Sequence, residues 1–454
     1  MVWRDGNEFR AVTNSLPNLL IGGDEDADLY AMVSGMRERM ARLFPICRSI
    51  TGDGVRATLA DIAQTIPLAV HEVSTGTAVL DWTVPQEWNI RGGWIRDSAG
   101  RTIVDFAQCN LHVVNYSIPV RRKMGLAELQ SHLHSLPDRP ASIPYVTSYY
   151  SETWGFCLTQ ECRDALVEDT YEIFIDSSLV DGTLTYGELV VPGRSSDEIL
   201  LTTHICHPSL ANDNLTGIAM LTAIGELLVR SPQRRFTHRL LFIPGTIGSL
   251  TWLAQHRTEA QAVRHGIVIT GVGDSGPPTW KRTRNGDDPV DQAVLHVLRA
   301  HGDHRELDYY PYGYDERQFS SPGFALSVGR FGRSVHGEYP EYHTSADSLD
   351  FVHDANMSDS LVLLAEILDV LDGNETYVNL SPYGEPQLGR RGLYRAIGGA
   401  VDRRSAEMAV LWVLNQSDRT HSLLDIAERS SIAFRTVCEA AQALVAAGLL
   451  EPVR

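Results

Sequence analysis

The sequence predicts an α/β fold in which a mostly parallel sheet carries helices on both faces. Between Glu198 and Val328, short apolar runs alternate with segments whose apolar residues recur at helical spacing. This alternation is typical of strand–helix–strand units, which need a parallel sheet with both faces covered. With 454 residues, the chain is long enough for two or three domains and a large core.

Composition narrows the class of protein. Hydrophobic residues make up 43% and charged residues 21%, as in a globular protein. The formal net charge of −18 opposes nonspecific binding to nucleic acid and to anionic membrane surfaces. Six scattered cysteines suit reduced thiols. The amino terminus has neither a signal-peptide pattern nor an apolar run of about 20 residues, so we expect a cytoplasmic protein that does not enter a membrane.

Patterns of polar and apolar residues divide the first part of the chain into segments. Residues 1–26 are polar, and we expect an irregular arm there. Helical spacing then predicts that residues 27–68 begin the main domain. Residues 69–129 consist of short strand-like runs separated by Gly, Pro and Asn, which predicts a small inserted β domain. The main domain resumes over residues 130–372 and closes with an apolar-faced helix.

The carboxyl-terminal part is a separate unit. Gly, Pro and Asn between residues 373 and 399 predict a linker. Residues 398–454 hold three helical patterns and resemble a winged helix, with almost no room for a wing hairpin after the last helix. Residues 402–454 contain seven acidic and six basic residues, so they lack the clustered cations of a groove-binding surface. We expect a packing or oligomerisation module, and a homo-oligomer, rather than a nucleic-acid partner.

The polar stretch THICHPSLANDNLTG, residues 203–217, follows a buried strand and opens a helix. Such loops gather ligands at the carboxyl ends of parallel strands. Imidazole and carboxylate groups suit zinc, and a catalytic zinc site uses about three protein ligands. His204 and Asp213 are the first two candidates. His343, in the polar and aromatic segment EYPEYHTSAD, is the third.

A resemblance strengthens this interpretation. The strings THICHPSLANDNLTG, PYGYDERQFSSPG and GEYPEYHTSADS resemble a family of bacterial aminopeptidase-like zinc proteins. That family is related to the di-zinc leucyl aminopeptidase and glutamate carboxypeptidase type enzymes, and the likeness extends over nearly the whole chain. The resemblance implies that His204, Asp213 and His343 are metal ligands, and that Asp274 is the carboxylate for a second metal ion.

Gly245 departs from the family pattern. The resemblance places there a Glu that acts as general base, a role that contributes roughly 10²- to 10⁴-fold to such hydrolyses. Its loss predicts reduced or altered peptidase activity and favours one zinc ion over two. Another carboxylate could take the role, and Glu316, Glu338 and Glu341 are the alternatives; of these, Glu316 and Glu341 are our tentative catalytic residues.

Substrate-binding candidates lie in two further loops. Arg282 and Arg284 could meet a carboxylate or phosphate through paired N–H donors, and Tyr314 and Arg317 lie in the segment that the resemblance turns toward the site. We expect a zinc-dependent hydrolase that cleaves an amide bond of a small amino-acid-derived, peptide or sugar-linked substrate. Two alternatives stay open: a catalytically silent metal- or ligand-binding protein, and a ligand-sensing regulator that uses the terminal domain.

Overall fold

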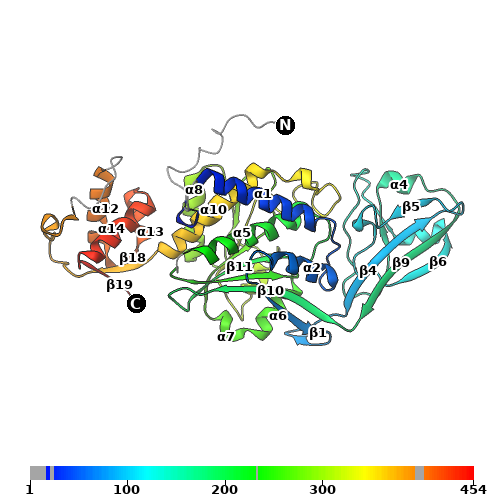
Figure 1. Cartoon of the computed structure of the whole chain (residues 1–454), viewed down its shortest axis with the longest axis horizontal. Helices are drawn as coiled ribbons and strands as arrows, with labels where there is room; N and C mark the ends of the chain where they lie inside the picture. Colours follow the sequence, from blue (N-terminus) through cyan, green and yellow to red (C-terminus); the bar gives the residue numbers. More distant parts are fainter. Residues whose placement is uncertain (1–16, 21–24, 232–233, 394–402, 454) are drawn as a thin grey trace.

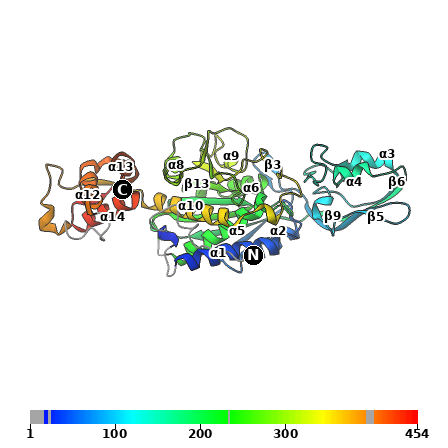
Figure 2. The ribbon, with the colours of Figure 1, turned by 90° about the horizontal axis from the view of Figure 1, so that it is seen from above.

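The molecule consists of three parts in a row. The computed structural model describes residues 17–20, 25–231, 234–393 and 403–453. A central α/β domain lies between a β-rich unit and a helical module at the carboxyl end (Figure 1), and the same order is seen from above (Figure 2). The arm expected over residues 1–26 lies mostly outside the described residues.

An eight-stranded mixed sheet forms the centre of the α/β domain. Its neighbours β12, β11, β13 and β16 run parallel, whereas β1 and β10 at one edge pair antiparallel. The predicted fold class, a mostly parallel sheet between helices, is therefore confirmed. In spatial order the strands are β1 (Ala69–Ser74), β10 (Thr183–Val191), β12 (Thr237–Ile243), β11 (Glu198–His204), β13 (Val263–Ile269), β16 (Val328–Gly332), β14 (Thr279–Lys281) and β15 (Arg305–Leu307).

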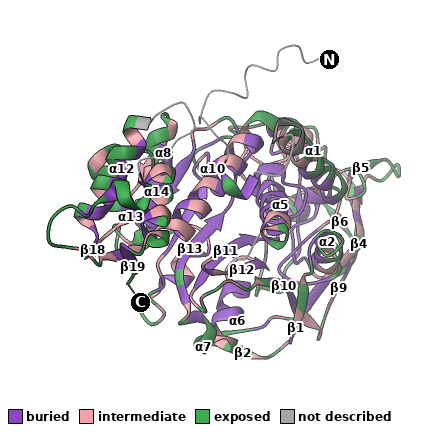
Figure 3. Ribbon diagram, turned by 60° about the vertical axis from the view of Figure 1, so that its left-hand side comes forward, coloured by how far each residue is buried: buried purple, intermediate pink, exposed green. Residues whose placement is uncertain are grey.

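Helices cover both faces of this sheet, as Figure 3 shows by the buried strands between them. Alternate residues of β11 point to opposite cores: Ile199 and Leu201 join one cluster and Leu200 the other. The first cluster includes α1 (Glu25–Leu43), α2 (Asp53–Ile62), α5 (Thr216–Arg230), α8 (Pro289–His301) and α10 (Asp354–Gly373). The second lies under α6 (Ile247–Gln255), α7 (Arg257–Ala260) and α9 (Glu316–Phe319).

The inserted β unit has different limits from those expected. Strand β1, placed in the insertion by its local pattern, pairs with β10 in the central sheet. The four-stranded sheet of the unit instead recruits β9, far beyond residue 129. The hairpin of β2 (Ala78–Val79) and β3 (Trp82–Thr83) packs against α6 of the central domain. The elements of the unit are β4 (Glu87–Arg96), β5 (Thr102–Asp105), β6 (Val120–Gly125), α3 (Leu126–Leu129), β7 (Leu133–His134), β8 (Phe156–Cys157), α4 (Gln160–Asp164) and β9 (Thr170–Val180).

The carboxyl-terminal module is a small helical domain with a three-stranded sheet. Its strand β17 lies in the predicted linker, so the module begins before residue 398. After the last helix, the short strand β19 pairs with β17, although the tail was expected to leave almost no room for a wing hairpin. The module contains β17 (Thr376–Asn379), α12 (Arg403–Gln416), β18 (Asp418–Ser422), α13 (Leu423–Ser430), α14 (Phe434–Ala446) and β19 (Leu450–Pro452).

Short helical turns complete the described chain: η2 (Asn18–Leu20), η3 (Asn110–His112), η4 (Gln130–His132), η5 (Ala211–Leu215), η6 (Leu349–Phe351) and η7 (Leu388–Arg391). None of the described helices combines the length and the apolarity that crossing a bilayer requires.

Candidate metal centre

Strand β11 delivers His204 to the carboxyl edge of the sheet. All seven of its residues are buried, because it lies between β12 and β13 with both faces covered. The chain then turns through η5, which carries Asp213, before α5 begins. His204 Nε2 lies 3.0 Å from Asp213 Oδ1, and both side chains are buried. The two ligands predicted in this stretch are therefore in contact.

His207, three residues further along the same loop, belongs to the cluster. Its Nδ1 lies 3.1 Å from His204 Nε2 and 3.3 Å from Asp213 Oδ2. The loop is fixed by the buried Arg48, whose guanidinium donates to the carbonyl oxygens of His207 at 2.7 Å and Pro208 at 3.1 Å. His207 was not among the predicted ligands, although it lies inside the motif that suggested the site.

His343 joins the cluster from a loop much further along the chain. Its Nε2 lies 3.1 Å from Asp213 Oδ2. The backbone of His343 has φ +53°, which is uncommon for a residue with a side chain. Its carbonyl oxygen accepts a 2.8 Å hydrogen bond from the Tyr145 amide, so the segment is held in place. The structure thus brings together the three predicted ligands and one more.

The donor set fits a metal ion. Ligand atoms of His204, His207 and Asp213 all lie within 4.8 Å of one another. Asp213 Oδ2 and His343 Nε2 are buried and close, yet neither has a hydrogen-bond partner. Unpartnered polar atoms that converge in a buried place suit a bound cation, which would satisfy them. Neutral imidazole and carboxylate are the ligands that zinc prefers among nitrogen and oxygen donors.

Electrostatics favour a charged Asp213. Burial alone would raise the pKa of this carboxyl, but the surrounding imidazoles of His204, His207 and His343 hold it well below its usual range. Asp213 is thus ionised at neutral pH. Asp347 holds the backbone of this loop in place, because its carboxylate accepts hydrogen bonds from the backbone amides of Asn212 at 2.6 Å and Asp213 at 2.9 Å.

Asp274 lies next to this network rather than in the cluster. Its carboxylate accepts hydrogen bonds from Asn212 Nδ2 at 2.8 Å, Ser334 Oγ at 2.6 Å and the Gly276 amide at 2.7 Å. Both oxygens therefore have donors. Its predicted role with a second metal ion stays a prediction.

Aromatic rings surround the four candidate ligands. Tyr314 stacks on His204 with ring centroids 5.1 Å apart, and Tyr342 stacks on His343 at 3.9 Å. Tyr145 contacts His207 edge-on at 5.2 Å. These rings fix the imidazole planes and exclude water from their outer faces. The cluster opens to a small cavity of about 200 Å³.

Gly245 and Asp315 both line this cavity. A Cβ atom at Gly245 would lie 3.5 Å from Cys206 Sγ and 3.7 Å from His204 Cβ, so the backbone leaves room for a side chain. Asp315 approaches the same place from another loop. Its Oδ1 accepts the amide of Thr246, the residue after Gly245, at 2.7 Å and Ser249 Oγ at 3.0 Å. Burial raises the pKa of Asp315 to about 6.

The predicted catalytic carboxylates lie elsewhere. Glu316 is fully buried, and its Oε1 pairs with Lys281 Nζ at 2.8 Å. Glu341 is half-buried and does not line the cavity, and its carbonyl oxygen accepts the Thr344 amide at 3.1 Å. Asp315, the neighbour of Glu316, is therefore better placed than either. A sequence signal existed, since Asp315 lies in the quoted string PYGYDERQFSSPG.

Of the predicted substrate-binding residues, Tyr314 lines the cavity. Arg282 is bound to Glu306 at 2.7 Å and to the Gly286 carbonyl at 2.7 Å. Arg284 approaches the Ser320 carbonyl at 3.5 Å. Arg317 lies over the ring of Tyr312, with its Cζ 5.9 Å from the ring centroid. The three arginines do not line the cavity.

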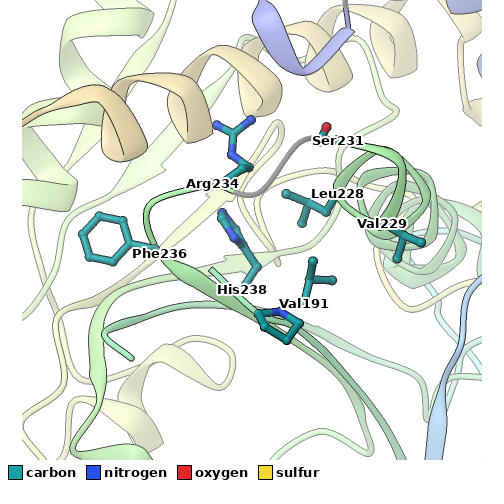
Figure 4. Close-up of a pocket in the computed structure, with 8 residues that line it drawn as sticks. Val191, Leu228, Val229, Ser231, Arg234, Phe236 and His238 are labelled. Atoms are coloured by element: carbon teal, nitrogen blue, oxygen red, sulfur yellow. The ribbon is translucent and has the colours of Figure 1, made fainter. Parts of the chain in front are cut away.

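Another cavity, of about 280 Å³, lies away from the cluster, between the end of α5 and strand β12 (Figure 4). Arg234 pairs there with Asp369 at 2.8 Å, and burial lowers the pKa of His238 to about 4. Its described lining residues include no group of metal-ligating side chains like that around Asp213.

Comparison with known proteins identifies the family. A family model described as a domain of unknown function, DUF4910, matches residues 37–374. The chain belongs to the DUF4910 family. A second model, described as a winged helix-turn-helix, matches residues 375–452 and confirms the expected nature of the carboxyl-terminal module.

Two similar proteins support the likeness of this DUF4910 protein to aminopeptidases. A Clostridium acetobutylicum protein named for polysaccharide biosynthesis and an aminopeptidase-like domain is 49% identical over 90% of this chain and 94% of its own. A crystal structure of a protein from the same organism, described as a peptidase, matches with a TM-score of 0.88 and 46% identity over 94% of this chain and 98% of its own. The predicted aminopeptidase-like resemblance is confirmed.

The fold is also that of a zinc aminopeptidase. The enzyme BSAP from Bacillus subtilis matches with a TM-score of 0.56 over 75% of this chain and 94% of its own. At 13% identity, this match shows the shared fold and not a shared activity.

Proposed function

We propose that this protein is a zinc-dependent, aminopeptidase-like hydrolase that cleaves an amide bond of a small amino-acid-derived or sugar-linked molecule. The convergence of His204, His207, Asp213 and His343 at the mouth of a small cavity carries the proposal. The Clostridium relative named for polysaccharide biosynthesis supports a sugar-linked substrate.

His204, His207, Asp213 and His343 would hold one zinc ion. When bound, zinc polarises a carbonyl group and lowers the pKa of water. Asp347 keeps the Asp213 loop in position through two backbone hydrogen bonds. Because hydrogen-bond donors already occupy Asp274, we propose one ion rather than two.

Asp315 is our candidate for the base that Gly245 does not supply. It lines the cavity, and its Oδ1 is fixed by two donors beside Gly245. A carboxyl whose pKa lies near 6 can accept a proton at neutral pH and return it to the leaving amine. The side chain therefore suits proton transfer during amide hydrolysis.

Hydrolysis of an aminoacyl-nitroanilide panel, with zinc content measured in parallel, tests the proposal. We expect zinc-dependent release of nitroaniline that is lost in His204→Ala and Asp213→Ala. Full zinc occupancy with no hydrolysis of nitroanilides or of sugar-linked amides would favour a catalytically silent binding protein. This is the second candidate, because Gly245 stands where the related enzymes are expected to have their general base.

A further inference from the structure

A buried arginine, Arg330, lies behind the cavity wall with no ion-pair partner among the described residues. Arg330, on strand β16, is 1% exposed, and its Nε and Nη2 atoms are buried with no hydrogen-bond partner. Burying a cation without a counter-ion is costly, so buried charges are normally paired or serve a ligand. The described residues provide Arg330 with no ion pair.

The free atoms of Arg330 form the edge that binds carboxylates. Nε and Nη2 lie on one side of the guanidinium and donate two parallel hydrogen bonds to the two oxygens of a carboxylate. Arg239 uses this same edge inside the protein: its Nε binds Glu198 Oε2 at 2.6 Å and its Nη2 binds Glu198 Oε1 at 2.7 Å. Arg330 presents the same edge without the carboxylate.

Neighbouring charges do not neutralise Arg330. The buried Lys281 and Glu316 neutralise each other across 2.8 Å, and neither oxygen of Glu316 bonds to Arg330. Burial, together with the charge of Arg330, lowers the pKa of His336 to about 4, so this imidazole is neutral. Glu338 is paired with Arg305 at 2.6 Å, so none of the described carboxylates forms an ion pair with Arg330.

Tyr314 joins Arg330 to the metal-ligand cluster. Its ring stacks on His204, its hydroxyl lies 3.4 Å from Asp213 Oδ1, and its ring centroid is 5.7 Å from Arg330 Cζ. The side chain of Tyr314 thus spans the distance between the metal-ligand cluster and Arg330, and this distance is comparable with the length of an amino acid. His336 lines the cavity beside Tyr314, with its Nδ1 buried and unpartnered.

We propose that Arg330 is a carboxylate-binding group of this site, and that the substrate carries a carboxylate at the end remote from the amide bond. Binding requires Tyr314 or His336, which form the wall between, to turn aside and admit the anion. This inference rests on the proposed function for the amide, whereas the anion subsite stands on the geometry of Arg330.

Matched ligands test the subsite. Alanyl-glycine, alanyl-β-alanine and alanyl-4-aminobutyrate place a carboxylate at increasing distance from the amide, and each has a neutral carboxamide counterpart. Binding is measured by calorimetry with zinc-loaded and with metal-free protein, and hydrolysis of the same compounds is followed by amine release. The variants are Arg330→Gln and Arg330→Met, with Arg264→Gln, an exposed ion-paired arginine, as the control.

We expect at least one acid to bind about tenfold or more tightly than its carboxamide, with or without zinc, since charge-assisted hydrogen bonds are the strong ones. The preference should fall to about one in both Arg330 variants and persist in Arg264→Gln. The Arg330→Met protein should melt at or above the wild-type temperature, because it no longer buries an unpaired charge. A structural arginine would instead lower the melting temperature.

Equal binding of acids and carboxamides, or a preference that survives Arg330→Gln, would overturn the subsite even if amides are hydrolysed. Tighter, Arg330-dependent binding of inorganic phosphate than of every carboxylate would overturn the assignment to carboxylates. Arg330-dependent acid binding without any hydrolysis would support the subsite and count against the hydrolase.

Discussion

The residue at position 245 strongly affects which chemistry this site can perform, and here it is Gly245. The resemblance to aminopeptidases expects a carboxylate there, and the cavity has room for one, since an added Cβ would make only ordinary contacts. Asp315 lies beside it, bound to the next amide of the chain. The sequence revealed the missing carboxylate, and it contains Asp315 in the string PYGYDERQFSSPG, but only the folded chain shows that the two positions adjoin, because 70 residues separate them.

The exchange Asp315→Asn tests the proposed base. We expect kcat/KM for the best substrate to fall by about 10²- to 10⁴-fold, the usual contribution of a general base. Wild-type activity should rise with pH through an acid limb at or somewhat below pH 6, since the carboxyl must be deprotonated and a bound cation lowers its pKa further. The control is Asp303→Asn, an exposed site. Retention of activity and of the limb would exclude Asp315.

The exchange Gly245→Glu tests the resemblance itself. The Cβ of the new side chain would lie 3.7 Å from His204 Cβ, an ordinary contact, so the carboxylate beyond it can extend into the cavity without displacing the backbone. We expect faster nitroanilide hydrolysis at unchanged zinc content. If hydrolysis does not increase while zinc is retained, the site is built for other chemistry.

At the scale of elements, the carboxyl ends of β11 and β12 and the start of α5 make the site. Their apolar runs and helical spacing predicted this arrangement, because a covered parallel strand is recognisable from its own residues. Sheet membership was less predictable: β1 pairs with β10 in the central sheet and β9 pairs with β4 in the inserted unit, and such long-range pairing is not visible in a strand's own residues. His207 was missed for a related reason, because the loop after β11 has no periodicity that orients its side chains.

Asp347 tests how far the loop depends on support from another element. Asp347→Asn replaces one acceptor oxygen by a donor, so one of the two amides of η5 loses its partner. We expect zinc affinity to fall about 10- to 100-fold, as for other groups that orient metal ligands, in competition with a chromophoric chelator. The exposed Asp350→Asn is the matched control. Unchanged affinity would show that the loop holds its shape without Asp347.

At the scale of the whole molecule, the central domain and the terminal module are joined by packing as well as by the chain. The terminal module packs on the central domain: Leu424 joins the central core, and Phe434 contacts both this core and that of the module. Its winged-helix nature was predictable from the helical patterns, whereas its first strand was not, because β17 lies in a segment that reads as a linker.

The charge of the molecule predicts its behaviour toward nucleic acid. A formal net charge of −18 repels phosphate, and DNA binding needs clustered cations. We expect no retention of duplex DNA in a mobility-shift experiment at about 50 mM salt. A shift that disappears at higher salt would instead support the alternative of a ligand-sensing regulator that uses the terminal domain.

Buried histidines predict acid sensitivity of the fold. Burial lowers the pKa of His238 to about 4, whereas the unfolded side chain titrates near 6.5. Between these values the unfolded chain binds the extra proton, so the free energy of unfolding falls as the pH falls, by up to about 1.4 kcal/mol per pH unit. His238→Gln should therefore lose less stability than wild type between pH 7 and pH 5 in urea unfolding, and the exposed His353→Gln should lose as much as wild type. Equal losses in all three would contradict this origin.

Anomalous diffraction at the zinc edge from zinc-soaked crystals measures the central claim most directly. The account predicts one strong peak enclosed by His204, His207, Asp213 and His343, and no second peak at Asp274. A peak elsewhere, or none at full zinc saturation, would contradict it.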